Sequence, residues 1–407
     1  MAQALDDEME WTDPATSDAV RRVDGVATEL IEAADETEKL GTLSERSVRA
    51  VKDSGAMRLL QPEEHGGYAA HPRDFAEAVM AIARRCGATG WVTGVVGVHP
   101  WEIAMLDPRV GQEVWADDQD TWVASPYTPA GIAARVDGGY VLNGRWQFSS
   151  GTDHADWVFL GALTGDSTGK MEMPPTFLHV ILPRPDYEIV DDSWNVVGLA
   201  GSGSKDIVVK DAFIPEYRAV PHADVADGTA AERVGRTETL YKLPFPVVFP
   251  LGISAAVIGI AEGALALHLE YQRERVNVAG ARIREDPYSL YAISEAAADI
   301  DASRAQLLDG VTQAFDHVAS GHALSQHQTM RIRRNQIRSA WRAVTAVDEI
   351  FARSGGTAGR LDNPLQRFWR DAHMGLQHYI HVPGPVFHAS ALLEMGVDLP
   401  DSLRGAS

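Results

Sequence analysis

Cysteine is almost absent from this sequence, which has one, Cys86, among its 407 residues. A single cysteine cannot form a disulfide bond within the chain, and it cannot complete a zinc site of the usual cysteine and histidine type. We therefore predict no metal site. A reducing compartment such as the cytoplasm is the simplest location for such a chain.

Basic residues are also scarce, because 36 lysines and arginines stand against 57 aspartates and glutamates, for a formal net charge of −21. The densest basic run, Arg331 to Arg334 with Arg338, has a helical spacing that spreads its side chains around the helix. An acidic surface without a basic patch repels phosphate backbones. The composition therefore argues against nucleic acid as a partner.

Neither a signal peptide nor a membrane span is predicted. The first residues are acidic and lack a basic segment followed by an apolar core, so we interpret residues 1–18 as a flexible acidic tail. The most apolar stretch, residues 247–269, approaches the length of a membrane-spanning helix, but Pro250, Glu262 and His268 interrupt it. We expect it to be a buried helix of a bundle.

The remaining sequence divides into three regions. Residues 19–119 have apolar positions at helical spacing and predict an N-terminal helical domain. Residues 120–232 contain short β-branched and aromatic runs between turn signals, which predict a β domain, as an antiparallel barrel or a small sandwich. Residues 233–407 return to long amphipathic helices and predict a four-helix-type bundle. The expected fold class is mainly α with a central β domain.

Within the predicted β domain, Asp137-Gly138-Gly139 marks a hairpin turn. The run from Gly198 to Gly203 resembles a phosphate-binding glycine motif only superficially, because it lies between β runs and no helix follows it. The stretches predicted as strands are residues 121–125, 139–148, 156–163, 176–182 and 205–214.

One segment, GRWQFSSGTDHADW (144–157), combines flat aromatic side chains with bare hydroxyls. Trp146 and Phe148 alternate with a polar residue as in a strand, and Ser149-Ser150 then break the pattern. Serine hydroxyls and freed backbone N–H groups at such a break can bind the polar atoms of a flat ligand. The alternative interpretation is an ordinary sheet corner with the tryptophans in the core.

Two stretches outside this segment are also candidates for a pocket. Pro126 prevents a regular central strand, so the backbone at Ser125 is expected to bend away from its ladder. Trp91 lies among small residues of a predicted helix, and His99 follows it. Close helix packing through glycine explains the small residues equally well.

A group of histidines lies near the C-terminus, where His373, His378 and His381 fall within nine positions. Their spacing does not match a zinc site. A histidine near neutral pKa is suited to proton exchange, or to donating a hydrogen bond to a reactive anion. A structural hydrogen-bonding role is the alternative for each of them.

Together these stretches resemble the acyl-CoA dehydrogenase fold, with which GYVLNG (139–144), the segment around Arg275 and the Arg370-Asp371 pair agree. Within that fold, FSSGTDHADW, GSGSKD (201–206) and RFWRDAHxGLxH (367–378) resemble the oxygenase component of two-component, flavin-dependent aromatic monooxygenases. Those related to 4-hydroxyphenylacetate 3-hydroxylase and to the secosteroid phenol hydroxylases are the most similar. The resemblance covers roughly residues 20–395.

One departure separates this sequence from the dehydrogenases, which need a carboxylate base. In many of them the base lies nine residues past the Arg of the Arg-Asp pair, and Tyr379 stands there here, with no Asp or Glu between Asp371 and Glu394. Glu270 and Glu274 keep an FAD-dependent acyl-CoA dehydrogenase open as an alternative. N- or S-oxygenation on the same scaffold, and a flavin-free scaffold, are further alternatives.

The resemblance implies a mechanism. A separate reductase supplies reduced flavin, and oxygen adds at C4a to give a hydroperoxide that hydroxylates a phenolic or polyketide-like aromatic. His378 would donate a hydrogen bond to the peroxide, and Ser149 or Ser150 would bond flavin N5. His99 or His381 would contact the substrate and accept the phenol proton.

The resemblance also implies an assembly and a set of flavin-site residues. Arg275 would contact a flavin phosphate, from a neighbouring subunit, because this fold usually forms tetramers. The segment 353–357 keeps the glycines of the dehydrogenase FAD segment without its glutamine, which favours reduced FMN and leaves FADH2 open. The expected flavin-site residues are Trp91, Ser125, Pro126, Phe148, Ser149, Ser150, Arg275, Gly355, Gly356, His378 and Tyr379.

Overall fold

A run of short helices opens the chain. The computed structural model describes residues 17–277 and 279–403, so nearly all of the predicted tail, residues 1–18, lies outside the described residues. Ser17 and Ser44 accept hydrogen bonds from first-turn N–H groups and so start α1 and α3. The helices are α1 (Asp18–Asp24), α2 (Ala27–Leu40), α3 (Glu45–Ser54), α4 (Pro72–Ala83), α5 (Gly87–Val96), α6 (His99–Ile103) and α7 (Pro108–Trp115).

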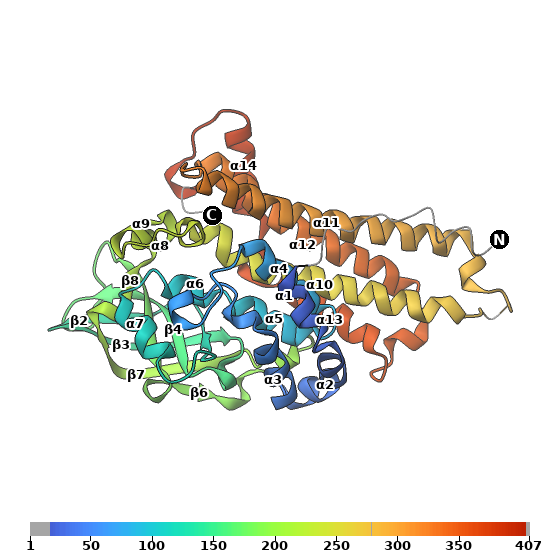
Figure 1. Ribbon diagram of the computed structural model, residues 1–407, viewed down its shortest axis with the longest axis horizontal. Coiled ribbons are helices and arrows are strands. Elements are labelled where there is room, and N and C mark those ends of the chain that lie inside the picture. Colours follow the sequence, from blue (N-terminus) through green and yellow to red (C-terminus); the bar gives the residue numbers. More distant parts are fainter. Residues whose placement is uncertain (1–16, 278, 404–407) are drawn as a thin grey trace.

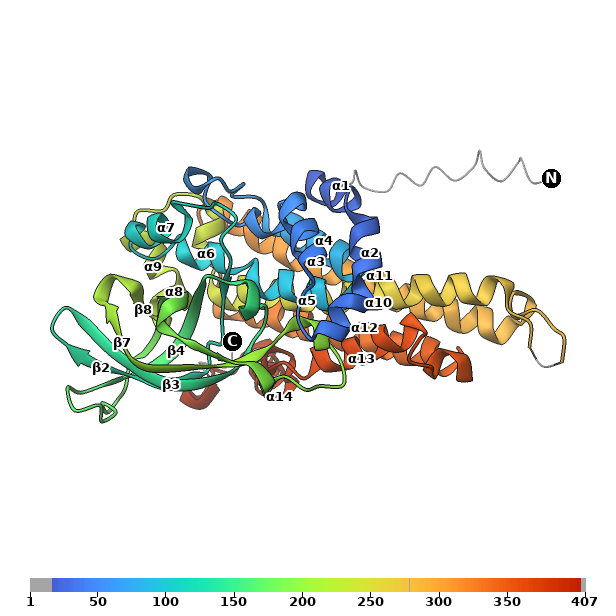
Figure 2. The ribbon, with the colours of Figure 1, turned by 90° about the horizontal axis from the view of Figure 1, so that it is seen from below.

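The strands that follow form one sheet with the order β6-β7-β3-β2-β4-β5-β8, and β1 pairs with β4 (Figure 2). The predicted hairpin is confirmed, because Val136 of β2 pairs with Gly139 of β3 around Gly138, whose φ is 77°. The strands are β1 (Val123–Ala124), β2 (Pro129–Val136), β3 (Gly139–Ser149), β4 (Trp157–Gly165), β5 (Phe177–Pro183), β6 (Glu188–Val190), β7 (Lys205–Pro215) and β8 (Ala219–Pro221).

The prediction of a purely antiparallel arrangement is wrong, because β4 pairs in parallel with both β1 and β2. The reason is the hairpin that precedes it. β3 runs antiparallel to β2 and returns the chain to the end at which β2 begins. β4 therefore pairs first with β1 and then, from Gly161, runs beside β2 in the same direction, without the helical crossover that parallel strands usually need.

All of the predicted strands are present, but β2, β6 and β8 were not predicted. The sequence of β2 begins at Pro129 and contains Gly131 and several alanines, a composition that is not typical of strands. Pairing with β3 on one side and β4 on the other imposes the extended conformation. The other two strands have three residues each, too few for a periodic pattern.

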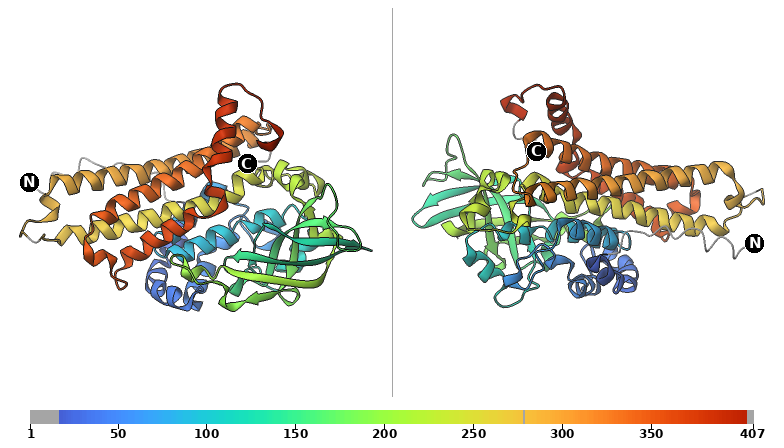
Figure 3. Two further views of the ribbon diagram at one scale, coloured as in Figure 1. Left: turned by 180° about the vertical axis from the view of Figure 1, so that it is seen from behind. Right: turned by 45° about the horizontal axis from the view of Figure 1, so that its top comes forward.

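The rest of the chain is helical, and the predicted fold class, mainly α with a central sheet, is confirmed. Helices α10, α11 and α12 lie side by side as long rods, and α13 packs beside α10 (Figures 1 and 3). The α10–α11 connection lies at the end of the bundle remote from the sheet. The helices are α8 (His222–Asp227), α9 (Thr229–Arg233), α10 (Phe245–Glu274), α11 (Pro287–Ala319), α12 (Gln326–Ala352), α13 (Pro364–Leu376) and α14 (Pro383–Glu394).

Helix α10 is the apolar stretch that the sequence marks out. It is long and apolar enough to cross a membrane by length and composition, but 89% of its most apolar window is buried inside the protein. It packs against α4, α5, α12 and α13. The prediction of a buried bundle helix is confirmed.

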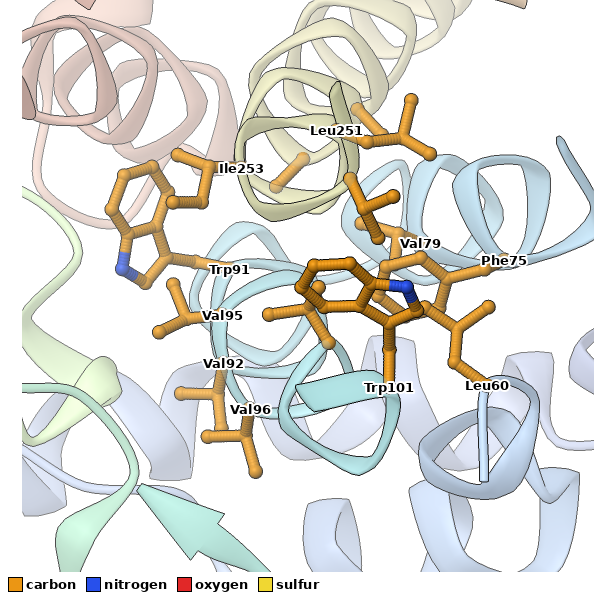
Figure 4. Close-up of a cluster of buried hydrophobic side chains, with 14 of the residues drawn as sticks. Leu60, Phe75, Val79, Trp91, Val92, Val95, Val96, Trp101, Leu251 and Ile253 are labelled. Atoms are coloured by element: carbon orange, nitrogen blue, oxygen red, sulfur yellow. The ribbon is translucent and has the colours of Figure 1, made fainter. Parts of the chain in front are cut away.

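Helices α4, α5, α6 and α10 enclose the part of the core that carries the candidate site. Phe75, Trp101 and Leu251 are buried in it, and Trp91 lies at its edge (Figure 4). Helices α5 and α10 approach each other through Gly94 and Gly252, where a Cβ on either would overlap the carbonyl oxygen of the other. The small residues that follow Trp91 therefore serve close helix packing as well.

This crossing gives a matched pair of glycine substitutions. Gly94→Ala should destabilise the protein by about 1–3 kcal/mol, because the two helices must move apart to accept the methyl group. Gly310→Ala, on α11 where a Cβ meets nothing within 4 Å, should instead stabilise it by about 0.5–1 kcal/mol. Calorimetric melting temperatures measure both effects. A Gly94→Ala protein as stable as the wild type would contradict the described crossing.

Candidate active site

The end of β3 makes a strained bend. Phe148 has a φ of 70° although it is not glycine, and the β3–β7 register shifts between Trp146 and Ser149. The left-handed backbone turns the Phe148 ring out of the sheet, so that it is 60% exposed. Trp146 stays completely buried, with its indole N–H donating to the Gly161 carbonyl oxygen at 2.8 Å. The bend therefore leaves Trp146 in the core and Phe148 exposed to solvent.

Glycine fixes the bend against helix α5. Gly151 has a φ of 72° and its N–H donates to the Ser202 carbonyl oxygen at 2.8 Å. A Cβ at Gly151 would come within 2.8 Å of the Val92 side chain on α5. This close approach places Ser150 beside Trp91, one residue before Val92.

Ser150 lies at the centre of a small polar cluster. The indole N–H of Trp91 donates to Ser150 Oγ at 3.2 Å, and Ser150 Oγ lies 3.0 Å from Ser204 Oγ. The ring of Trp91 meets the ring of His378 edge to face, with centroids 5.8 Å apart. The structure thus brings Trp91, Ser150 and His378, which the sequence singles out separately, into one place.

His378 follows the C-terminal end of α13, which packs closely on Trp91 through Gly375. The Ile380 N–H donates to His378 Nδ1 at 3.3 Å. Burial, together with the positive charge of Arg333, lowers the pKa of His378 to about 4. The ring is therefore neutral at pH 7, and its proton lies on Nε2 because Nδ1 is an acceptor. His378 presents a hydrogen-bond donor, not a cation.

A second histidine has the opposite arrangement. His99, at the start of α6, is completely buried, and its Nδ1–H donates to the Val123 carbonyl oxygen at the start of β1. Burial lowers its pKa to about 4. In this tautomer Nε2 carries a lone pair, and Nε2 has no hydrogen-bond partner among the described residues. His99 is therefore a buried acceptor, and Ser125, also buried, follows two residues after Val123.

The strand before Ser125 ends early, as predicted. β1 stops at Ala124, and the Pro126 carbonyl oxygen accepts the Gly161 N–H at 3.2 Å.

The other predicted substrate residue, His381, already has two partners. Its Nδ1 lies 3.0 Å from the Gly375 carbonyl oxygen, and its Nε2 lies 3.2 Å from Ser254 Oγ. Of these two predicted substrate residues, His99 is therefore the one whose ring nitrogen has no hydrogen-bond partner among the described residues.

Ser149 does not join the cluster around Ser150 by any described hydrogen bond. Its side chain is completely buried, and its Oγ has no hydrogen-bond partner among the described residues.

Tyr379 lies beside His378 but is 81% exposed. Phe148 meets Trp194 edge to face at 6.3 Å, so exposed flat rings border the cluster.

The remaining predicted flavin residues form a separate group. Arg275 follows α10, and its Nη1–H donates to the Arg353 carbonyl oxygen at 3.1 Å. Gly355, with a φ of 75°, lets the Arg275 guanidinium lie against the backbone where a Cβ would collide with it. The space at Gly356 is open. Helix α13 separates this group from His378, and its length of about 20 Å follows from a rise of 1.5 Å per residue.

Some residues of the site were missed by sequence reasoning. Ser204, which lies within GSGSKD, was not assigned to the site, although it contacts Ser150. A buried network of Glu102, Tyr127 and His179 also lies next to His99. The histidine inside the apolar run TFLHVIL was the available signal, since a buried polar residue in a strand requires a partner.

The two glutamates that left an acyl-CoA dehydrogenase as an alternative function lie outside this site. Glu270 and Glu274 are both exposed, in the last turns of α10 next to Arg275. They are therefore not with the cluster of Trp91, Ser150 and His378.

The neutral state of His378 predicts a loss of stability in acid. An unfolded histidine binds a proton below about pH 6.5, whereas folded His378 does so only near pH 4. Its contribution is complete above pH 6.5 and is lost as the pH falls from about 6.5 to 4. The melting temperature of the wild type should therefore drop more steeply over this window than that of His378→Gln. His388→Gln, at an exposed position, is the control, and equal slopes for His378→Gln and wild type would contradict the lowered pKa of His378.

Known proteins share this fold and much of this sequence. The family model "Acyl-CoA dehydrogenase, C-terminal domain" matches residues 251–383. A pigment production hydroxylase of Rhodococcus erythropolis is 51% identical over 96% of this chain and 99% of its own. The flavin-dependent monooxygenase oxygenase subunit HsaA of Rhodococcus jostii is 39% identical over 94% of this chain and 100% of its own.

A solved structure supports the same relationship. The crystal structure of 3-HSA hydroxylase from Rhodococcus sp. RHA1 superimposes with a TM-score of 0.90 and 38% identity, over 96% of this chain and 100% of that one. The chain therefore belongs to the oxygenase components of flavin-dependent monooxygenases that have the acyl-CoA dehydrogenase fold.

Proposed function

We propose that this protein hydroxylates a phenolic or polyketide-like aromatic compound, with reduced flavin supplied by a separate reductase. The observation that carries the proposal is the pair of neutral histidines with opposite tautomers. His378 presents an Nε2–H donor next to Trp91, whose indole N–H bonds Ser150, and His99 presents a buried Nε2 acceptor near Ser125. A donor at the oxygen-activating position and an acceptor at a phenol are the two polar functions that this reaction requires.

The residues around Ser150 fit the ring of a reduced flavin. Beyond its bonds to Trp91 and Ser204, Ser150 Oγ can offer one further hydrogen bond to a polar ring edge, as a donor or as an acceptor. The Nε2–H of His378 offers a fixed donor, and Phe148 exposes a flat apolar face. Reduced flavin, when bound, supplies the activation of molecular oxygen. Trp91 is 5% exposed and closes the inner side of the cluster against the core (Figure 4).

At the substrate, His99 would take the phenol proton. The phenol O–H bond breaks, its electron pair stays on oxygen, and the proton bonds to His99 Nε2, whose lone pair has no partner among the described residues. A phenolate is a more electron-rich ring than a phenol, so oxygen transfer to the ring is easier. His381 does not serve this role in the proposal, because both of its nitrogens have partners.

A second copy of the chain would complete the flavin site, within the tetramer that the fold leads us to expect. Arg275 and Gly356 lie at the far end of α13 from His378 in the same chain. Arg275 offers a bidentate fork to a phosphate, and the open space at Gly356 leaves room for it. We keep FMN as the expected flavin and FADH2 as the alternative, and we place the protein in the cytoplasm.

The function is tested by supplying chemically reduced FMN or FADH2, oxygen and a panel of phenols. The wild type should give a product heavier by one oxygen atom, with little hydrogen peroxide. His378→Ala should shift the yield from product to hydrogen peroxide by about tenfold or more, because the Nε2–H donor next to Trp91 is lost. His388→Ala is the matched control on exposed α14.

Release of hydrogen peroxide with every phenol tried would contradict the function. An unchanged ratio of product to peroxide in His378→Ala would remove His378 from the mechanism while leaving the function intact.

The shared site is tested by co-expressing two variants in one cell. Ser150→Val and Arg275→Ala should each lower product formation by about tenfold or more, since each removes hydrogen bonds to the flavin. If the two residues act from different copies, random mixed assemblies restore about one quarter of the sites. Cells that produce only one of the two variants are the control. No recovery in the mixture would place both residues of a working site in one chain.

A further inference from the structure

The buried network next to His99 has no role in the reaction described so far. Glu102 lies three residues after His99 on α6 and is 1% exposed. Its Oε2 accepts the Tyr127 O–H at 2.6 Å, and its Oε1 accepts the Nδ1–H of His179 at 2.6 Å. A carboxylate held out of water is costly, so its retention inside the protein calls for an explanation.

The network connects the core to the surface. His179, on β5, is completely buried, and its Nε2 lies 3.0 Å from Nδ1 of His222 at the start of α8. The ring of Tyr127 lies 5.7 Å from that of His99 and 4.3 Å from that of His179. His99, Tyr127, His179 and His222 are the titratable groups that surround Glu102.

Glu102 is ionised in this setting. Burial alone would raise its pKa, but the interaction with His179 and the hydrogen bonds from His179 and Tyr127 outweigh that cost and hold the pKa below its usual value. Burial also raises the pKa of Tyr127, and the neighbouring Glu102 raises it further, so Tyr127 stays a neutral donor. A fixed negative charge therefore lies one helical turn from His99.

His99 needs such a charge if it is to accept a proton. Its pKa is about 4 mainly because it is buried; Glu102 is the largest influence in the opposite direction, and His179 adds a smaller lowering. An ordinary phenol, like the tyrosine side chain, has a pKa of about 10, so the acidity constants differ by about six orders of magnitude. A positive charge on His99 would have no solvent to stabilise it.

We propose that Glu102, held by His179 and Tyr127, is a positioning residue whose negative charge stabilises the positive charge that His99 acquires from the phenol. This inference rests on the proposed function, in which His99 Nε2 takes the phenol proton. Glu102 gains and loses no proton in this step. The hydrogen bonds from His179 and Tyr127 keep the Glu102 carboxylate ionised and fix its position relative to His99. The proton moves only from the phenol oxygen to His99.

The test uses phenols of decreasing pKa, from about 10 to below the assay pH. The rate of product formation in a single turnover is measured for wild type and Glu102→Gln with the same reduced flavin, and their ratio is taken for each phenol. Gln keeps the shape of Glu and can bond both neighbours, but it removes the charge. Taking the ratio for each phenol cancels the intrinsic reactivity of its ring.

Glu102→Gln should be slower than wild type by about tenfold or more with phenols of high pKa. The ratio should return to within about twofold for phenols that are already ionised in solution, because no proton then has to reach His99. A ratio that is equally low for all phenols would mean that Glu102 is only structural. A ratio near one for all phenols would also overturn the proposal.

Glu113→Gln is the matched control. Glu113, on α7, likewise accepts a tyrosine O–H, from Tyr217, and pairs with a cation, Arg218, but it lies at the surface. Its ratio should stay near one for every phenol. If Glu102→Gln does not fold, Glu102→Met with His179→Phe removes the same charge by replacing the buried pair with apolar side chains, and the same dependence on phenol pKa is expected.

His99→Gln separates this inference from the proposed function. A full rate of His99→Gln with phenols of high pKa would remove His99 as the acceptor, and the role of Glu102 would fall with it. If His99→Gln forms product slowly but Glu102→Gln forms it at the wild-type rate, only the role of Glu102 is overturned. Absence of any hydroxylated product from wild type would instead contradict the proposed function.

Discussion

The close contact between the end of β3 and helix α5 is the constraint on which the rest of the site depends. Glycine at 151 allows the contact, and the Trp91 N–H to Ser150 hydrogen bond closes it. A side chain at that glycine would push the sheet away from the helix, and Ser150 would lose its hydrogen bond from Trp91. The ring of the same tryptophan also meets the ring of His378 edge to face. One helix thus aligns the sheet with the bundle.

Electrostatics then give two like residues unlike roles. His378 and His99 are both neutral, because burial lowers the pKa of each to about 4. A backbone N–H occupies Nδ1 of His378, and a backbone carbonyl occupies Nδ1 of His99, so the free Nε2 is a donor in one and an acceptor in the other. A single main-chain partner therefore decides each role.

Sequence reasoning predicts the order of helical and β regions, the hairpin and five strands, because each depends on local periodicity and turn chemistry. It does not predict that β4 runs parallel to β2, since periodicity carries no information about strand direction. Trp91, Ser150 and His378 were identified individually, but their meeting depends on glycine contacts between distant segments. Glu102 and His179 were missed because 77 residues separate them.

The central claim is that the reduced flavin ring lies where β3, α5 and α13 meet. An anaerobic crystal structure of the protein with reduced flavin tests it most directly. The account predicts ring density with a polar edge within hydrogen-bonding distance of Ser150 Oγ and facing His378, and a phosphate at Arg275 of a second copy. Ring density remote from Ser150 and His378 would contradict it.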